Sequence, residues 1–305
     1  MTMNGFTNLH EWSELNKKHD IGTVGFSKMQ IILYLAVSVL TGLVSLASHA
    51  HEFWIEPSDF QPEPGDRVSV DLVIGTDFQG LSSPYTPDEI AAFAMIDAAG
   101  ERPITGRFGD MPAGQITAAQ AGLTLLYHQT GPLFVNYRKP EKFISFAMEK
   151  GFAEIAALYQ QVEVENFRLV EQYRRFAKSL VMVGSTAGQN QLLGQDQLLG
   201  LEMELVALTN PYQHPAPETF RMAVYESGVP RPGAQVTVFI RHAPRDIEQR
   251  IIVADEDGQI QMPLLPGRQY LFDSVKLYRL KKPDTETGAE WESLWASLTF
   301  AVPAD

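Results

Sequence analysis

A histidine follows a run of small residues near the start of the chain, in the segment SLASHAHEFWIEP from Ser45 to Pro57. If an export protease cuts after Ala50, His51 becomes the first residue of the mature protein. Its free amine and its ring nitrogen then hold one metal ion together, and nitrogen ligands of this kind suit Cu, Ni or Co. In the alternative interpretation, His51 begins the first strand and its ring is solvated. The metal hypothesis therefore depends on this cut.

A second histidine is placed to complete such a site. His128 lies in LLYHQT, where strand alternation puts Leu126 and His128 on one face and Leu125 and Tyr127 on the other. A histidine that ends a strand reaches a neighbouring edge, where the N-terminal strand is expected to pair. We therefore predict His128 as the second metal ligand. The alternative is a hydrogen-bonded histidine at a strand end.

Further ligands are harder to choose. His214 lies in the proline-rich segment NPYQHPAPE and His242 in RHAPRD, and neither has another histidine at ligand spacing. Both are expected on surface loops. Glu52 and Glu56 share one face of the strand after His51, and they offer an oxygen ligand or a hydrogen bond to a ligand. The alternative is that they form the solvated face of an edge strand.

Motifs of common enzymes are missing from the sequence. It lacks GxSxG, the P-loop, the dinucleotide fingerprint and HExxH. The chain has no cysteine, which excludes disulfides, thiolate metal sites and cysteine nucleophiles. The DEDG of Asp255 to Gly258 lacks the ligand spacing of a calcium loop and is expected to be a hairpin turn. We therefore expect a protein that is not an enzyme.

Residues 1–50 have the features of an export leader. Gln30 to Ala47 is apolar, three lysines precede it, and Ser48-His49-Ala50 follows as a small-residue cleavage site. Met29 is an alternative start, because the segment before it is unusually long. The other interpretation is an uncleaved membrane anchor, since roughly 18 apolar residues can span a bilayer. We predict cleavage, a periplasmic location and no membrane association after the cut.

Composition narrows the choice of partners. The chain has 305 residues, 45% of them hydrophobic and 20% charged, which is typical of a globular protein. Its net charge of −13 argues against nucleic acid and anionic membrane surfaces as partners, since each would need a basic face. This negative net charge is compatible with a soluble protein that encounters cations as ligands.

The pattern after the leader is mostly β. Strand-like runs include HEFWIEP, VSVDLVIG, AAFAMID and LTLLYHQ, followed later by KSLVMVG. From Leu201 seven more follow, with turns between them: LEMELVAL, ETFRMAVYES, AQVTVFIR, QRIIVAD, GQIQMPL, QYLFDSVKL and SLWASLTFAV.

One segment breaks this rhythm. Apolar residues at helical spacing follow Pro140, which suits a first helical turn, and Gly151 separates two short helices. The helical character is expected to continue to about residue 176. Ala187 to Gly200, rich in Gly and Gln, is expected to be a linker or long loop.

The expected fold is mainly β, with two immunoglobulin-like or prealbumin-like β-sandwich domains. The first spans residues 51–200 and carries the helical insertion at about 139–176, and the second spans 201–305. Aromatic residues gather at both ends of this region, and most are expected in the core: Phe53, Trp54, Trp291, Trp295 and Phe300.

Several segments in order resemble the DUF4198 family, once described as a nickel-transport-complex component. They are AHEFWIEP, KPEKFISFAMEKGF, EQYRRFAKSLVMVG, LGLEMELVALTNPY and EWESLWASLTF. The resemblance implies an exported protein with a role in metal handling. It supplies no catalytic motif. Some members have histidine near the end, where this chain has Lys276 in SVKLYRL.

We therefore predict an exported, non-enzymatic periplasmic protein that binds or delivers nickel, cobalt or copper, with His51 and His128 as ligands. A metal transporter or an outer-membrane receptor is the expected partner. The main alternative is a structural or interaction module of the cell envelope that contacts a receptor, a carbohydrate or a partner protein. A copper oxidase that uses His51 is a third possibility.

Overall fold

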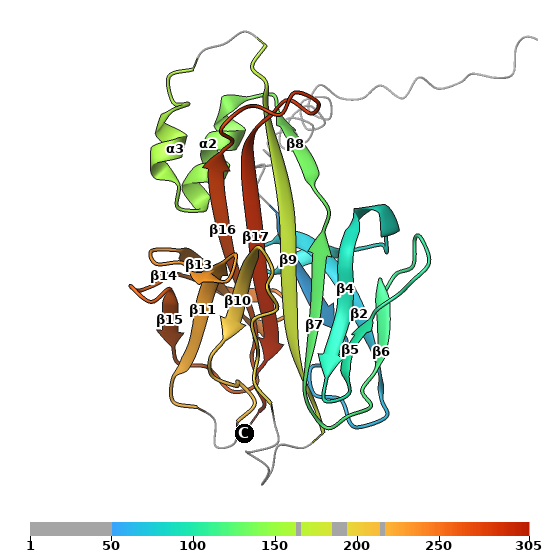
Figure 1. The fold of residues 1–305 in the computed structure, drawn as a ribbon. Helices are drawn as coiled ribbons and strands as arrows, with labels where there is room; N and C mark the ends of the chain where they lie inside the picture. Colours follow the sequence, from blue (N-terminus) through green and yellow to red (C-terminus); the bar gives the residue numbers. More distant parts are fainter. Residues whose placement is uncertain (1–50, 163–165, 185–193, 214–216, 305) are drawn as a thin grey trace, which may run out of the picture. The chain divides into compact units, whose positions relative to one another are not determined.

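The computed structural model describes residues 51–162, 166–184, 194–213 and 217–304 (Figure 1). The chain divides into two units, Met1–Ala47 and Ser48–Asp305, and every element described below belongs to the second. Strands hold 52% of the described residues and helices 8%, in several sheets that agree with a β-sandwich. This confirms the predicted fold class. The predicted leader, residues 1–50, lies outside the described residues.

The strands follow one another in chain order as β1 (Glu52–Pro57), β2 (Arg67–Thr76), β3 (Gln79–Ser83), β4 (Ile90–Asp97), β5 (Gly100–Pro103), β6 (Gly114–Thr117), β7 (Gly122–Thr130), β8 (Leu133–Tyr137), β9 (Leu169–Val183), β10 (Met203–Ala207), β11 (Phe220–Glu226), β12 (Val229–Pro230), β13 (Gln235–Ala243), β14 (Asp246–Val253), β15 (Gln259–Met262), β16 (Gln269–Arg279) and β17 (Ala289–Ala301). The helices are η2 (Pro87–Glu89), α2 (Pro140–Glu149) and α3 (Ala153–Ala157). All the strand-like runs predicted from the sequence are found as strands.

A nine-stranded sheet forms the centre of this unit. Its order is β14-β13-β16-β17-β9-β7-β4-β5, and β8 also pairs with β9. Neighbours run antiparallel except β17 and β9, which are parallel. Strands β7 and β8 pair with successive halves of β9, β8 from Leu169 to Tyr173 and β7 from Phe176 to Val183.

Two four-stranded sheets cover the two faces of this central sheet. Alternation along β9 shows the arrangement, because Phe176 and Leu180 belong to one core and Ala177 and Val181 to another. The first core lies against β10, β11 and β15, and the second against β1, β2 and β6. The fold is therefore two sandwiches that share one sheet.

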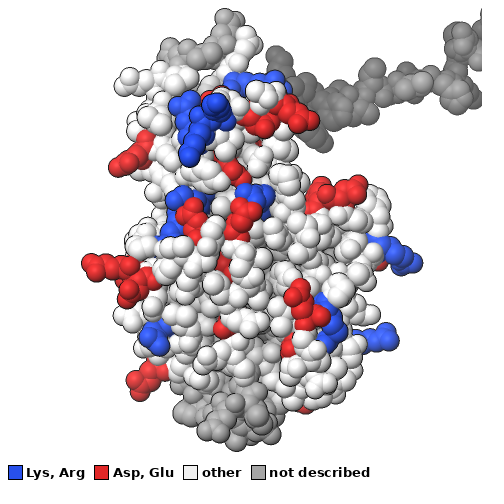
Figure 2. Space-filling model, viewed as in Figure 1, with Lys and Arg blue, Asp and Glu red and all other residues white. Residues whose placement is uncertain are grey.

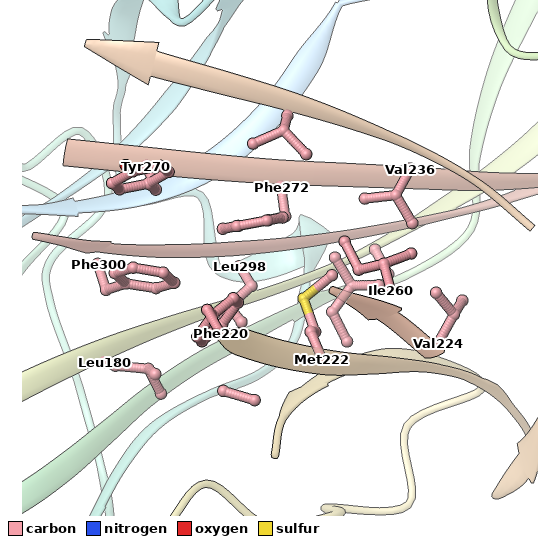
Figure 3. Packing of buried hydrophobic residues seen from close by; sticks show 14 of the residues in the cluster. Leu180, Phe220, Met222, Val224, Val236, Ile260, Tyr270, Phe272, Leu298 and Phe300 are labelled. Carbon is pink, nitrogen blue, oxygen red and sulfur yellow. The ribbon is translucent and has the colours of Figure 1, made fainter. Parts of the chain in front are cut away.

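The larger core is rich in aromatic rings. Phe220 on β11 packs against Phe272 and Phe300 of the central sheet, with ring centroids 5.5 and 5.1 Å apart. Tyr270 lies beside Phe300 at 5.4 Å. Figure 3 shows these rings filling the space between the two layers, with Leu298 and Met222 next to them. Burial of such rings supplies much of the hydrophobic driving force in a sandwich.

The predicted boundary near residue 200 falls inside one compact unit. Ser48–Asp305 forms that unit, and the central sheet contains strands from both sides of residue 200, such as β9 beside β17. The parallel pairing of β9 with β17 extends along most of both strands, and it joins the part of the chain before residue 200 to the part after it. The sequence predicted sandwich domains over 51–200 and 201–305, but not a sheet that contains strands of both ranges.

The predicted pair of helices is present but shorter than expected. Helix α2 has Pro140 in its first turn, and Gly151, with a φ of 85°, separates it from α3. Phe143 and Phe146 bury one face of α2. The prediction of helix to residue 176 was wrong, because Leu169–Val183 is strand β9. This central strand is covered on both faces, so its apolar residues do not alternate as they do in an edge strand.

The predicted linker is partly anchored. Residues 185–193 lie outside the described residues, and 194–200 have no regular secondary structure. Within that stretch the carboxylate of Asp196 lies 2.7 Å from Nζ of Lys178, which also contacts Glu204 at 3.0 Å. All three side chains are buried. Glu204 also accepts hydrogen bonds from the amides of Leu199 and Gly200, so charge holds this segment against β9.

The remaining sequence predictions about the fold have mixed outcomes. The five aromatic residues expected in the core are all at most 7% exposed, which confirms that prediction: Phe53, Trp54, Trp291, Trp295 and Phe300. The DEDG segment is a turn, but it joins β14 to β15, which pair with different strands in different sheets. The prediction of a hairpin was therefore wrong.

Charged residues at the surface often pair with one another. Figure 2 shows Lys and Arg side chains lying beside Asp and Glu side chains at several places on this face. Arg174, for example, contacts both Glu202 and Glu292, the second at 2.7 Å. No helix within the described parts of the chain is long and apolar enough to cross a membrane.

Candidate metal-binding site

Strand β1 carries His51 to one end of the second core. The strand begins one residue later, and its neighbour in the sheet is β2. Hydroxyl groups of β17 hold β1 against the central sheet, because Ser297 donates to the carbonyl of Phe53 and Thr299 to that of Ile55, each over 2.7 Å. His51 is exposed, and alternation places it on the same side of the strand as Phe53.

His128 lies in the interior beside Phe53. It sits opposite Phe93 of β4 and Ala177 of β9, and only 2% of it is exposed. The ring lies 5.1 Å from that of Phe53 and 5.4 Å from that of Phe93. As predicted, His128 shares its face with Leu126, which belongs to the same core. The predicted edge pairing is wrong, because β1 pairs with β2 in a different sheet from β7.

The ring of His128 has an unusual environment for a buried polar group. Neither ring nitrogen has a hydrogen-bond partner among the residues that the structure describes. Buried polar atoms normally have such a partner, because leaving one unpaired costs about 1–3 kcal/mol. Burial lowers the pKa of His128 to about 3, and the charge of Arg175 adds to this effect. The imidazole is therefore neutral at physiological pH, which is the form that binds a metal.

Arg175 is the neighbour that both histidines share. Its Nη2 donates to the carbonyl of His51 over 3.4 Å, and its guanidinium lies 5.5 Å from the centre of the Phe53 ring. Burial lowers the pKa of Arg175, although nearby negative groups such as Asp273 oppose the shift. Sequence analysis missed this residue because β9 was read as helical. Its charge disfavours a cation at this place.

Glu52 lies on the other side of β1, in a buried charge cluster. Its carboxylate accepts a hydrogen bond from Nζ of Lys150 over 2.6 Å, and the same Nζ lies 3.1 Å from Asp273. Burial raises the pKa of Glu52 to about 7, against the lowering effect of the Lys150 charge. The charges of Asp273 and Glu149, which share the same ammonium, raise it further. The ammonium also lies 5.0 Å from the centre of the Trp295 ring.

This arrangement corrects two expectations about the glutamates. Glu52 is 1% exposed, so it does not belong to a solvated face. Glu56 contacts Arg241 at 2.6 Å and accepts a hydrogen bond from Trp54. Both side chains lie on the side of β1 opposite Phe53, so neither is placed to assist His128 as a metal ligand.

The other predicted candidates do not join this site. His242 lies in strand β13 instead of a loop, and its two ring nitrogens contact Glu248 and Arg268 at 3.1 and 3.2 Å. His214 lies outside the described residues. Lys276 forms an ion pair with Glu226 at 3.2 Å. In the part of the chain that the structure describes, no three His, Asp or Glu side chains are grouped as a metal site.

Comparison with known proteins gives one family. The sequence model of DUF4198, described as a domain of unknown function, matches residues 48–275. No curated protein matches the chain.

Solved structures give weaker likenesses. A tetra-tandem repeat in the extending region of a large adhesion protein matches with 11% identity and a TM-score of 0.18, over 82% of this chain and 49% of that chain. The D0-D1 domain of intimin matches with 10% identity and a TM-score of 0.18, over 82% and 97%. Dimeric latent PorU from Porphyromonas gingivalis matches with 11% identity and a TM-score of 0.17, over 83% and 21%. The chain thus spans about half of the adhesion-protein chain and about a fifth of PorU. Scores this low carry no argument about function.

Proposed function

The chain belongs to the DUF4198 family, and on that premise we propose that it is an exported, non-enzymatic protein that binds and delivers nickel, cobalt or copper. The metal is its cargo. In this proposal an export protease cuts before His51 in the periplasm, and the cut creates an amine beside an imidazole. The nitrogen of His128 is the third donor. A metal transporter or an outer-membrane receptor takes the metal from it.

One observation carries the proposal, namely that both ring nitrogens of the buried His128 have no partner among the described residues. Phe53 contacts this ring, and His51 lies two residues before Phe53 on the same side of β1. Same-side neighbours along a strand are about 7 Å apart, so His51 is within reach of the region around His128. Three neutral nitrogen donors suit copper, nickel and cobalt better than magnesium or calcium.

The first experiment establishes the start of the protein. The full chain is expressed with its own leader, and the product is examined by N-terminal sequencing and intact mass. We expect His51 as the first residue. Isothermal titration of the chelator-treated product with Cu²⁺, Ni²⁺ or Co²⁺ should then show one binding site per chain.

Variants separate the two ligands from the rest of the protein. His51→Ala and a form that keeps a methionine before His51 should each lose the chelate, and His128→Phe should lose the third donor. His242→Asn is the matched control, because both nitrogens of that histidine already have partners, and it should bind metal like the wild type. A free His51 amine with no metal binding, or equal losses in His128→Phe and His242→Asn, would contradict the proposal.

Stability of the metal-free protein gives a second readout. Replacing His128 by phenylalanine removes two unpaired polar atoms from an aromatic setting of Phe53 and Phe93. We expect the free energy of unfolding to stay the same or to rise, by up to about 2 kcal/mol. A ring whose nitrogens were bonded to buried water would instead destabilise the protein when it is replaced.

A second candidate function is an interaction module of the cell envelope. It is supported by strand β14, which pairs only with β13 among the described strands and exposes Ile251 and Val253. An exposed sheet edge can take up a strand from a partner. A protein that bound none of the three metals but associated through this edge would favour the second function.

A further inference from the structure

The two edges of the nine-stranded sheet differ in kind. At one edge, β5 has only four residues and ends in Pro103, a length and composition that discourage further pairing. At the other edge, β14 has eight residues, Asp246–Val253, with neither Gly nor Pro. Ile251 is 57% exposed and Val253 63% exposed. Within the described parts of the chain, no strand pairs with the outer edge of β14, so this edge can take another strand.

The sequence of β14 is complementary to itself. Ile247, Gln249 and Ile251 alternate with Glu248 and Arg250, which form an ion pair of 2.6 Å on the other face. On one side of Gln249 the chain has Glu248 and then Ile247, and on the other side it has Arg250 and then Ile251. When a second copy of the strand runs in the opposite direction, each charged residue can therefore lie opposite a residue of the other sign.

We propose that β14 pairs antiparallel with β14 of a second copy of this chain, so that two nine-stranded sheets join across a two-fold axis. Gln249 of each copy lies at the axis. Glu248 of one copy is then opposite Arg250 of the other, and Ile247 is opposite Ile251. The contact is self-complementary, as a two-fold interface requires. This inference rests on the second candidate function and names its partner, and it is independent of metal binding.

Charge selects this register over its neighbours. When a two-fold axis is perpendicular to the joined sheet, directly opposite residues lie on the same face, so each symmetric register is centred on one residue. The nearest alternatives to Gln249 are centred on Glu248 and on Arg250. The first places Glu248 opposite its own copy, and the second places Arg250 opposite its own copy. Like charges directly opposite are destabilising, whereas opposite charges stabilise a pair. The register centred on Gln249 avoids both clashes and covers the exposed Ile251.

The surroundings of the charged pair fit the same register. Glu248 also contacts His242 of β13, and His242 accepts a hydrogen bond from Arg268. His242 lies on β13, the strand that pairs with the inner edge of β14. Its contact therefore holds Glu248 in place and leaves the outer edge of β14 unused.

Sedimentation velocity of the full exported protein over a concentration series tests the proposal. The wild type should show a concentration-dependent dimer. Arg250→Glu and Glu248→Arg should each weaken dimerisation by roughly tenfold or more, because each creates two like-charge pairs across the axis. The double variant Glu248→Arg with Arg250→Glu should dimerise like the wild type.

Mixing the two single variants gives the sharpest result. A strand with two acidic residues is complementary to one with two basic residues, so the mixture should form a heterodimer although each variant alone stays monomeric. A general loss of folding cannot produce this outcome. Ile251→Lys is a separate variant, expected to weaken the dimer through its contact with Ile247, and Glu286→Arg at an exposed site outside β14 should have no effect. A monomeric wild type at every concentration, or a mixture that does not associate, would overturn the proposal, and neither outcome affects the metal titrations.

Discussion

Nζ of Lys150 donates a hydrogen bond to Oε1 of Glu52 over 2.6 Å, and each side chain is at most 3% exposed. The bond connects the end of helix α2 to the first strand. Asp273 of β16 shares the same ammonium at 3.1 Å. A buried lysine thus fixes the residue that directly follows His51.

Replacing this lysine should destabilise the protein strongly. Lys150→Met leaves Glu52 and Asp273 as buried carboxylates without a cation, and breaking such a cluster from one side costs about 3–5 kcal/mol. Urea denaturation should show this as a lower midpoint with an unchanged slope. Lys282→Met, at an exposed position, is the control and should change the free energy of unfolding by less than about 0.5 kcal/mol. A loss below about 1 kcal/mol for Lys150→Met would show that the cluster contributes like a surface pair.

Glu171 should make stability depend on pH. This residue of β9 is 1% exposed and accepts hydrogen bonds from the hydroxyls of Tyr137 and Ser293. Burial raises its pKa from 4.5 to about 7, although both hydrogen bonds act to lower it. Between these two pH values, Glu171 of the folded protein therefore keeps a proton that the unfolded chain has lost. The stability that this provides is complete below about pH 4.5 and is lost as the pH rises through about 7.

The variant Glu171→Gln tests that dependence. A glutamine cannot lose a proton, so its free energy of unfolding relative to the wild type should increase steadily from about pH 4.5 to about pH 7. Thermal unfolding at several pH values measures the difference. Glu286→Gln, at an exposed site, should run parallel to the wild type. Parallel curves for Glu171→Gln as well would show that Glu171 is ionised throughout this range.

The charge of Arg175 should weaken metal binding. Its guanidinium donates to the carbonyl of His51 and contributes to the lowered pKa of His128. Removing this charge in Arg175→Gln should therefore tighten binding of a divalent metal, by roughly tenfold for a partly screened charge. Calorimetric titration with Ni²⁺ or Cu²⁺ measures the change.

The neighbouring arginine provides a matched control for this experiment. Arg174 pairs with Glu202 and Glu292. Successive side chains of β9 point to opposite faces, so Arg174 faces away from His51 and His128. Arg174→Gln should leave metal affinity unchanged. Equal effects of the two variants would indicate a general change in charge instead of a local one at the site.

Alternation allowed much of the fold to be predicted. It placed Leu126 and His128 on one face of β7, and Phe53 and Trp54 of β1 were expected in the core, where the structure has them. It failed for β9, because a central strand buried on both faces lacks a clear period of two. The pairing of β9 with β17 joins residues more than a hundred positions apart, and no local pattern contains that information.

The candidate site could be predicted only in part. His51 stood out because it follows the predicted cleavage site, and His128 because it ends a strand-like run. Arg175 and Lys150 did not, since a charged residue in a strand or at a helix end is usually solvated. Their burial depends on which elements pack together. The sequence of one element alone does not show whether its charged side chains are solvated or pair with charges of another element.

The position of β17 has a consequence for timing. The carbonyls of Phe53 and Ile55 are held by Ser297 and Thr299, so the first strand gains these contacts only after nearly the whole chain has emerged. Until then β1 can pair with β2 but is not yet held on the central sheet by these hydroxyl groups. The start of the described chain would therefore reach its final place late, once the last strand is in position.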